Sequence, residues 1–221
     1  MMPVVYRRFC EHGKTTPLPG IFLDRDGVIV EEIRYLHRRS DIRYIAGALA
    51  AIASACTMGI PTVVVTNQSG IGRGLYQWSD FEAVQEQVDS DLAGCGGRFN
   101  GVWACAAHPS GIGQYAHPSH PFRKPEPGMI RDAAHCLQLD LRRSWLVGDK
   151  PGDLEAGLRA QLAGVCLVAT GYGAASRLEV DRLLQQYGSP CEFLPCASLP
   201  DAMHHILAAI AQETACLTAR F

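Results

Sequence analysis

Short apolar runs alternate with helix-forming segments along the chain, and this alternation restricts the possible folds more than any other feature. The runs are rich in β-branched residues and cover residues 21–23, 60–67, 101–105, 144–149 and 165–170. Such continuous runs are typical of strands buried on both faces of a parallel sheet. Helices are predicted at residues 47–59, 79–92, 127–139, 153–164, 176–187 and 199–212, with a further strand near 191–194. We therefore expect a three-layer, doubly wound, Rossmann-like α/β fold with a mainly parallel sheet.

The domain organisation is predicted to be simple. No internal repeat or linker interrupts the pattern, so residues 20–221 are expected to form a single domain. Residues 1–19 are predicted to be an irregular arm that ends in Pro17 and Pro19.

Charge, apolar stretches and cysteines exclude several classes of protein. A net charge of −2 and a pI near 6.4 give no general attraction to nucleic acid or to an anionic membrane. The apolar stretches are too short to span a bilayer or to act as a signal peptide. The nine cysteines are scattered without a Cys-x-x-Cys pair, which predicts free thiols in a reducing cytoplasm. A monomer or weak homodimer is expected.

Polar side chains follow the predicted strands at the points where the strands end. Asp24 and Asp26 follow the first run in "IFLDRDGVIV", Thr66 and Asn67 follow the second, and Asp149 follows the fourth. Parallel sheets of this class bind ligands outside the carboxyl ends of their strands. We therefore expect these side chains to meet in one site.

The pair of acids after the first strand predicts a magnesium site. Residues i and i+2 of an extended chain point the same way, so Asp24 and Asp26 are expected to share a site while Arg25 points elsewhere. Two adjacent carboxylates repel each other, and a hard cation such as Mg²⁺ removes that repulsion. The alternative is a solvated turn, because Asp-Gly is a common turn dipeptide.

Three further segments add polar groups at the same edge. The glycine-rich "TNQSGIGRG" offers backbone N–H groups for an oxyanion. "FRKPEPG" supplies Arg123 and Lys124, and "LVGDKPGD" supplies Asp149 and Asp153. Several sets of polar groups at one sheet edge favour a binding or catalytic site over structural roles for each.

Taken in order, the segments "DRDGV", "TNQSG", "RKPEPG" and "GDKPGD" resemble the haloacid dehalogenase superfamily of phosphotransferases. Within it, the chain is similar to the heptose 1,7-bisphosphate phosphatases and the related histidinol-phosphate phosphatases, over about residues 20–170. The resemblance implies a magnesium-dependent phosphomonoester hydrolase that works through an aspartyl-phosphate.

The resemblance also implies a role for each strand-end residue. Asp24 would be the nucleophile, and Asp26 the general acid and base. Magnesium would be held by the Asp24 carboxylate, the Asp26 backbone carbonyl and Asp149. Thr66 and Lys124 would bind the transferring phosphoryl oxygens. For Asp153, capping a helix N-terminus is the preferred role.

The substrate is expected to be a small phosphorylated metabolite that enters an open site. Residues 25–65 separate Asp24 from Thr66, and a helix fills part of them, so there is no room for a large cap domain. Residues implied to contact the substrate are Glu32, Ile33, Arg34, Tyr35, Asn67, Gln68, Ser69, Arg73, Arg123 and Lys150. The alternative for each arginine is a solvated surface charge.

The details of "TNQSGIGRG" favour one branch of the family. The histidinol-phosphate branch usually has an acid at the position of Ser69 and lacks the arginine of "GRG". This favours D-glycero-D-manno-heptose 1,7-bisphosphate, cleaved at the 7-phosphate. A histidinol-phosphate or other small-metabolite phosphatase is the alternative, and a non-catalytic binding module on this fold is a more distant one.

The loop over residues 106–126 departs from the family pattern. Many relatives carry Cys-x-His and Cys-x-Cys there and bind a structural zinc, whereas this chain has Cys-Ala-Ala at 105–107 and His-Pro-Phe at 120–122. Cys105, His108, His117 and His120 offer four possible ligands in principle. We expect instead a loop without zinc, stiffened by its prolines.

Overall fold

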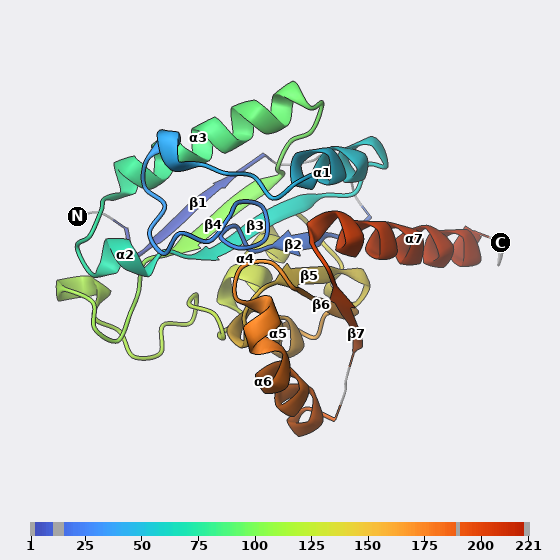
Figure 1. Cartoon of the computed structure of the whole chain (residues 1–221). Coiled ribbons are helices and arrows are strands. Elements are labelled where there is room, and N and C mark those ends of the chain that lie inside the picture. Colours follow the sequence, from blue (N-terminus) through green and yellow to red (C-terminus); the bar gives the residue numbers. More distant parts are fainter. Residues whose placement is uncertain (1–2, 11–15, 189–190, 219–221) are drawn as a thin grey trace.

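The computed structural model describes residues 3–10, 16–188 and 191–218, and these residues form a seven-stranded sheet at the centre of the molecule (Figure 1). The strand order across the sheet is β1-β4-β3-β2-β5-β6-β7. The strands are β1 (Val5–Phe9), β2 (Ile21–Leu23), β3 (Thr62–Asn67), β4 (Gly101–Cys105), β5 (Trp145–Gly148), β6 (Gly164–Val168) and β7 (Glu192–Cys196). All neighbours pair in parallel except β1 and β4, which are antiparallel.

Helices cover both faces of the sheet, which gives the expected three layers (Figure 1). One face packs against α1 (Ala48–Thr57), α3 (Trp78–Gly94) and α7 (Leu199–Thr218). The other face packs against α4 (Gly128–Cys136), α5 (Pro151–Ala160) and α6 (Gly173–Gln186). The shorter elements are α2 (Ser69–Gly72) and the 3₁₀ turns η1 (Arg39–Asp41), η2 (Gly113–Tyr115) and η3 (Leu141–Arg143).

Side-chain alternation in the central strands explains the two cores. In β2, Ile21 and Leu23 enter the core on the α1 and α3 side, while Phe22 enters the core on the α4 and α5 side. All three side chains are fully buried. Burying an aliphatic or aromatic side chain of this size stabilises the fold by roughly 1.5–3 kcal/mol. A strand buried on both faces therefore has no polar positions, which is why the sequence shows continuous apolar runs.

The topology brings the ends of three strands together. From β2 the chain adds β3 and β4 on one side of the sheet, and β5, β6 and β7 follow on the other side. The connections reverse direction at β2, and such a switch point leaves a crevice at the carboxyl ends of the strands. Asp24, Thr66 and Asp149 lie at the carboxyl ends of the adjacent strands β2, β3 and β5.

The prediction of an irregular arm over residues 1–19 is wrong for residues 5–9, and residues 1–2 and 11–15 lie outside the described residues. Residues 5–9 form strand β1, which extends the sheet beyond β4. Tyr6 stacks on Trp78 and meets Phe81 edge-on, at ring-centroid distances of 5.8 and 5.4 Å. The sequence does not show this strand as an apolar run, because it contains two adjacent arginines. Their side chains point outward to opposite faces, where Arg7 pairs with Asp132 and Arg8 with Asp89.

Among the helices that the structure describes, none combines the length and the apolar character needed to cross a bilayer.

The packing of Phe81 gives a test of the core. Phe81 lies on α3, and its fully buried ring contacts Tyr6 of β1 and Trp78, so Phe81→Ala should lower the free energy of unfolding by about 3–5 kcal/mol because a cavity remains. Leu178→Ala is the control, because Leu178 is 72% exposed and its loss should change stability by no more than about 0.5 kcal/mol. Urea denaturation of both variants measures the difference, and equal losses would contradict this description of the core.

Candidate active site

The chain turns sharply after β2 and exposes carboxylates at the sheet edge. The carbonyl of Arg25 accepts backbone N–H groups from Val28, Ile29 and Val30, which closes the turn. Gly27 has φ = +89°, a conformation that favours glycine. Asp24 continues the strand by one more hydrogen bond, from its N–H to the carbonyl of Val147 in β5 at 3.0 Å. Its carboxylate is thereby fixed at the junction of β2 and β5.

A buried lysine ammonium binds this carboxylate. Lys124 Nζ lies 3.1 Å from Asp24 Oδ1 and 2.7 Å from Asp153 Oδ1, and it donates to the carbonyl of Val65 at 2.7 Å. Burial opposes the charge, but Asp153 and Asp24 raise the pKa of Lys124, so the ammonium stays protonated. Burial likewise opposes ionisation of Asp24, but Lys124 and Lys150 lower its pKa. Asp24 is therefore an ionised, oriented carboxylate.

Asn67, which is half-buried, holds the backbone of Lys124 in place, and its predicted contact with substrate stays a prediction. Its amide nitrogen donates to the Lys124 carbonyl at 3.0 Å, and its amide oxygen accepts the Lys124 N–H at 3.1 Å. These two bonds use both ends of the amide. The end of β3 is thus fastened to the segment that carries Lys124.

Three buried carboxylates gather beside the lysine. In the described part of the chain, Asp24, Asp149 and Asp153 are the only group of three His, Cys, Asp or Glu side chains whose ligand atoms lie within 4.8 Å of one another. Asp149 Oδ1 is buried without a hydrogen bond, although Lys150 Nζ lies 3.3 Å away. Burial and the nearby Asp24 raise the pKa of Asp149 to about 7. An acidic cluster with an unsatisfied oxygen fits a hard divalent cation such as Mg²⁺.

Asp153 is not the N-cap residue of α5, which is Lys150, but its side chain takes part in a capping box at this helix N-terminus. The helix begins at Pro151, so Asp153 occupies its third position. The carboxylate accepts N–H groups from Asp149 and Lys150 at 3.2 and 3.0 Å and pairs with Lys124. It therefore braces the loop after β5 from within the helix.

The backbones of two glycines pack directly against the Asp149 carboxylate. A Cβ atom added at Gly27 or at Gly171 would lie 2.2 Å from Asp149 Oδ2. The N–H of Tyr172 donates to this same oxygen at 2.9 Å. The loop after β6 thus holds one oxygen of Asp149 and leaves the other, Oδ1, without a hydrogen bond.

The Asp26 carboxylate points away from this cluster. It forms a bidentate pair with Arg25, at 3.0–3.1 Å, and accepts from Gln68 Nε2 at 3.0 Å. Arg25 is fully buried and stacks over the Phe81 ring at 5.1 Å. The prediction that the Asp24 and Asp26 side chains share a site separate from Arg25 was wrong, because the Asp26 carboxylate pairs with Arg25. The alternation rule fails here because β2 ends at Leu23 and the following residues form a turn. The backbone carbonyl of Asp26 stays the predicted metal ligand.

The loop over residues 32–35 lies beside the cluster. Lys150 Nζ joins Glu32 and Asp149, at 3.0 and 3.3 Å. Arg34 has φ = +72°, and its N–H donates to Glu32 at 2.5 Å. Ile33 is 44% exposed. The Glu32 carboxylate thus connects this loop to the end of β5.

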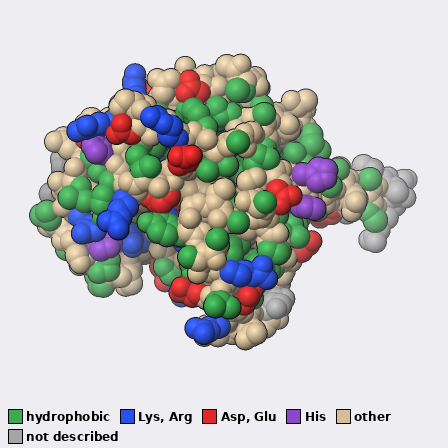
Figure 2. Space-filling model, viewed as in Figure 1, with side chains coloured by type: hydrophobic (Ala, Val, Ile, Leu, Met, Phe, Trp, Pro, Cys, Tyr) green, Lys and Arg blue, Asp and Glu red, His purple; other side chains and the backbone are tan. Residues whose placement is uncertain are grey.

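Two arginines extend from neighbouring segments, and one of them, Arg73, contacts this loop. Arg73 Nη1 donates to the Tyr35 hydroxyl at 2.7 Å and is exposed, while Arg123 is half-buried and donates to the carbonyl of Ala107 at 2.8 Å. Ser69 begins the short helix α2, directly before the glycine-rich turn. Figure 2 shows Lys and Arg side chains gathered over the region of α2 and the loop after β4, with acidic side chains beside them. None of these cations pairs with a carboxylate among the described residues.

The four candidate zinc ligands do not form a single cluster in the described structure. Cys105 Sγ lies 3.8 Å from His120 Nδ1, and the rings of His117 and His120 meet edge-on. The Nδ1 atom of His108 accepts the N–H of Ser110. These hydrogen bonds within the loop are consistent with our expectation of a loop without structural zinc, which stays a prediction.

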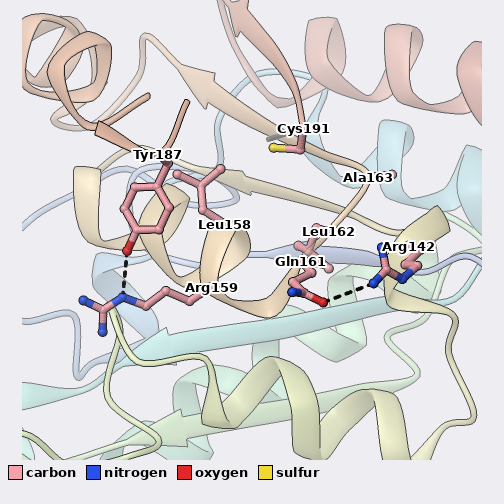
Figure 3. Close-up of a pocket in the computed structure, with 8 residues that line it drawn as sticks. All are labelled: Arg142, Leu158, Arg159, Gln161, Leu162, Ala163, Tyr187 and Cys191. Atoms are coloured by element: carbon pink, nitrogen blue, oxygen red, sulfur yellow. Dashed lines mark hydrogen bonds between the residues drawn. The ribbon is translucent and has the colours of Figure 1, made fainter. Parts of the chain in front are cut away.

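A separate hollow lies at the opposite edge of the sheet (Figure 3). It is lined by side chains near the amino ends of β5, β6 and β7, among them Arg142, Arg159, Tyr187 and Cys191. Arg159 is already paired with Glu126 and Glu155. Arg142 contacts only the Gln161 amide among the side chains of this hollow, which lies at the amino ends of the strands and not at their carboxyl ends.

Comparisons with known proteins agree with this geometry. A HAD-hydrolase-like family model matches residues 121–186. A D-glycero-beta-D-manno-heptose-1,7-bisphosphate 7-phosphatase of Mesorhizobium japonicum is 50% identical over 71% of this chain and 73% of its own length. The enzyme of that name from Escherichia coli K12 is 38% identical over 70% of this chain and 81% of its own length.

Two solved structures have the same architecture. A HAD-like phosphatase from Mesorhizobium loti is 41% identical, with a TM-score of 0.79 over 95% of this chain and 94% of that one. D,D-heptose 1,7-bisphosphate phosphatase from B. bronchiseptica, complexed with magnesium and phosphate, is 31% identical. Its TM-score is 0.74 over 86% of this chain and 99% of that one.

The raised pKa of Asp149 predicts how stability depends on pH without metal. Since its folded pKa of about 7 exceeds the ordinary value of 3.8, the folded state binds more protons than the unfolded state between these pH values. Stability should therefore fall as pH rises through this window. In chelator at pH 8, Asp149→Asn should be more stable than the wild type by about 1–4 kcal/mol, and the difference should vanish near pH 4.

Denaturation at the two pH values measures this difference. Mg²⁺ should narrow it, because a cation that binds the folded wild type stabilises it. Asp181→Asn is the control, since Asp181 is exposed and its surface pair with Arg177 should contribute no more than about 1 kcal/mol. An Asp149→Asn variant less stable than the wild type in chelator at pH 8 would contradict the assignment.

Proposed function

The chain belongs to the HAD-like heptose-1,7-bisphosphate 7-phosphatase family, and from this premise we propose that it removes the 7-phosphate from D-glycero-D-manno-heptose 1,7-bisphosphate. It is a phosphatase with a sugar bisphosphate type of substrate. The observation that carries the proposal is the buried arrangement of Asp24, Lys124 and Asp149 at the ends of adjacent strands. An ionised carboxylate beside an ammonium is suited to attack an anionic phosphoryl group.

Asp24 is the proposed nucleophile. Its Oδ1 accepts the Arg25 N–H at 2.8 Å and lies 3.1 Å from Lys124 Nζ. These contacts leave Oδ2 to attack phosphorus, so that the bond from phosphorus to the sugar oxygen breaks and an aspartyl-phosphate forms. Lys124 and the Thr66 hydroxyl stabilise the negative charge on the phosphoryl oxygens while the phosphoryl group moves from the sugar oxygen to Asp24.

Asp26 is the proposed general acid and base. In the first step it gives a proton to the leaving sugar oxygen. In the second step it takes a proton from the attacking water, the bond from phosphorus to Asp24 breaks, and inorganic phosphate leaves. The proton gained from the water in the second step is the one that Asp26 gives to the next leaving group, and Arg25 and Gln68 fix the position of its carboxyl group.

Magnesium is the proposed cofactor. Asp24, Asp149 and the backbone carbonyl of Asp26 would hold it, with Asp153 close by. When bound, it would supply positive charge that reduces the repulsion between the anionic nucleophile and the anionic substrate.

The substrate choice is argued from the unpaired cations. Arg73 and Arg123 lie near the site without a carboxylate partner among the described residues. A second phosphate on the sugar would pair with them, whereas a monophosphate would leave them unpaired. Histidinol phosphate carries one phosphate and a cation, so these arginines do not favour it.

Substitution of the strand-end acids tests the chemistry. Asp24→Asn should abolish turnover because an amide does not attack phosphorus, and Asp26→Asn should slow it by roughly 10²–10⁴-fold. Phosphate release measures activity, and circular dichroism checks the fold of each variant. A well-folded Asp24→Asn protein that retains substantial activity would exclude this mechanism.

A comparison of substrates tests the specificity. A charge-assisted contact worth roughly 1.5–3 kcal/mol should favour the heptose bisphosphate over its monophosphates and histidinol phosphate by about 10–150-fold in kcat/KM. Arg123→Ala should shrink this preference more than it slows hydrolysis of p-nitrophenyl phosphate. Arg142→Ala, at the opposite edge of the sheet, is the control and should change neither. Equal damage to both substrates by Arg123→Ala would refute the second-phosphate argument.

A further inference from the structure

The side chain of Gln68 lies inside the protein and not in the substrate crevice. It is 2% exposed, although the sequence predicted a substrate contact. Its amide contacts the side chains of Asp26, Thr66, Tyr76 and Arg25. Two of these four groups have proposed roles in the reaction, so Gln68 is placed to act on the chemistry without touching the substrate.

The surroundings of this amide permit one orientation. Nε2 donates to Asp26 Oδ2 at 3.0 Å and to Thr66 Oγ1 at 2.9 Å. Oε1 accepts the Tyr76 hydroxyl at 2.6 Å, with Arg25 Nη2 at 3.4 Å. A reversed amide would place its oxygen against the Asp26 carboxylate and its N–H groups against the Arg25 guanidinium. Burial raises the pKa of Tyr76, so this hydroxyl stays neutral and acts as a donor.

This orientation determines what the Thr66 hydroxyl can do. A hydroxyl has one proton to donate. Because Thr66 Oγ1 accepts from Gln68, its own proton stays available for another acceptor. Phosphoryl oxygens in the transition state are acceptors, so the Thr66 proton is left for them.

The same amide orients Asp26. One Asp26 oxygen, Oδ1, is bound by Arg25 alone, while Oδ2 is shared between Arg25 and Gln68. Gln68 thus ties the acid–base carboxylate to the phosphoryl-binding hydroxyl through a single side chain. Tyr76 holds the far end of that side chain.

We propose that Gln68, held in its orientation by Tyr76, is a positioning residue that fixes Thr66 as a hydrogen-bond donor and orients the carboxyl group of Asp26. The inference rests on the proposed function, since it concerns the residues proposed to bind and protonate the phosphoryl ester. It assigns to Tyr76 a role that neither its place in the sequence nor the "TNQSGIGRG" motif suggests.

Two isosteric substitutions test the proposal. Gln68→Glu replaces the N–H donors with an oxygen, so the Thr66 proton is drawn away from the phosphoryl group and Asp26 faces a second carboxyl. We expect kcat to fall about 100-fold, with KM changed less than about threefold. Tyr76→Phe keeps the ring but removes the hydroxyl, and kcat should fall about 10-fold.

The chain supplies a matched control for each change. Gln85 is also buried, and its Nε2 donates to the Asp89 carboxylate at 3.1 Å, away from the site. The Tyr44 hydroxyl donates to the Asp91 carboxylate at 2.5 Å. Gln85→Glu and Tyr44→Phe should lower the melting temperature and leave kcat within about twofold of the wild type.

A double-mutant cycle separates positioning from a general loss of structure. In a Thr66→Val background the hydroxyl is absent, so the kcat loss caused by Tyr76→Phe should shrink to less than about threefold. Independent, multiplying losses would overturn the proposal. So would losses in Gln68→Glu and Tyr76→Phe no larger than those in their controls. If circular dichroism shows that Gln68→Glu does not fold, the kcat of Tyr76→Phe and the double-mutant cycle still test the proposal.

All variants are assayed with the heptose bisphosphate and with p-nitrophenyl phosphate. A wild type that hydrolyses only p-nitrophenyl phosphate refutes the proposed sugar, and the comparison of variants then proceeds on that substrate. A wild type that hydrolyses no phosphomonoester refutes both proposals. The two failures are therefore distinguishable.

Discussion

The ammonium of Lys124, buried between Asp24 and Asp153, is the interaction on which the other parts of the site depend. Removing a charge from water is costly, and in this site the cost is offset by two carboxylates and the Val65 carbonyl. Removing one partner of such a buried ion pair typically lowers the free energy of unfolding by about 3–5 kcal/mol, because the remaining charge is buried without compensation. The ammonium thus joins the ends of β2 and β3 to the first turn of α5 and keeps the nucleophile ionised.

The site divides into regions of different charge around Asp24. On one side Lys124 compensates the carboxylates. On the other side Asp149 retains an oxygen without a hydrogen bond, so this side attracts a cation. Asp26 belongs to a third region, where Arg25 and Gln68 bind it away from the acidic cluster. This separation is what the proposed division of roles requires, in which Asp24 attacks phosphorus and Asp26 exchanges protons.

The sequence predicted the fold and the edge of the sheet that carries the site because buried parallel strands impose a pattern on most of the chain. Buried parallel strands must be apolar throughout, so β3 and β6 were visible as continuous runs. The carboxyl ends of parallel strands meet at one edge, so the sequence alone predicted that Asp24, Thr66 and Asp149 lie together. Strand β1 was missed because its outward arginines interrupt the apolar pattern, and its pairing with β4 is non-local.

The directions of the side chains at the turns could not be predicted from the sequence. Alternation holds within a strand but not after β2 ends, so the pairing of Arg25 with Asp26 was not foreseen. The resemblance implied that Asn67 and Gln68 contact substrate, and nothing in the sequence indicated that the amide groups of both residues form hydrogen bonds within the protein. A buried Tyr76 eight residues from Gln68 gave no signal of its own, since aromatic residues at such positions usually fill the core.

The central claim is that Asp24 carries the phosphoryl group during turnover. Rapid quenching of the enzyme during hydrolysis of its sugar bisphosphate, followed by borohydride reduction, would convert an aspartyl-phosphate into homoserine. Mass spectrometry of the digested protein locates that change. The account predicts homoserine at position 24, only when substrate and Mg²⁺ are present. Homoserine at a different aspartate, or its absence from position 24 while phosphate is being released, would contradict it.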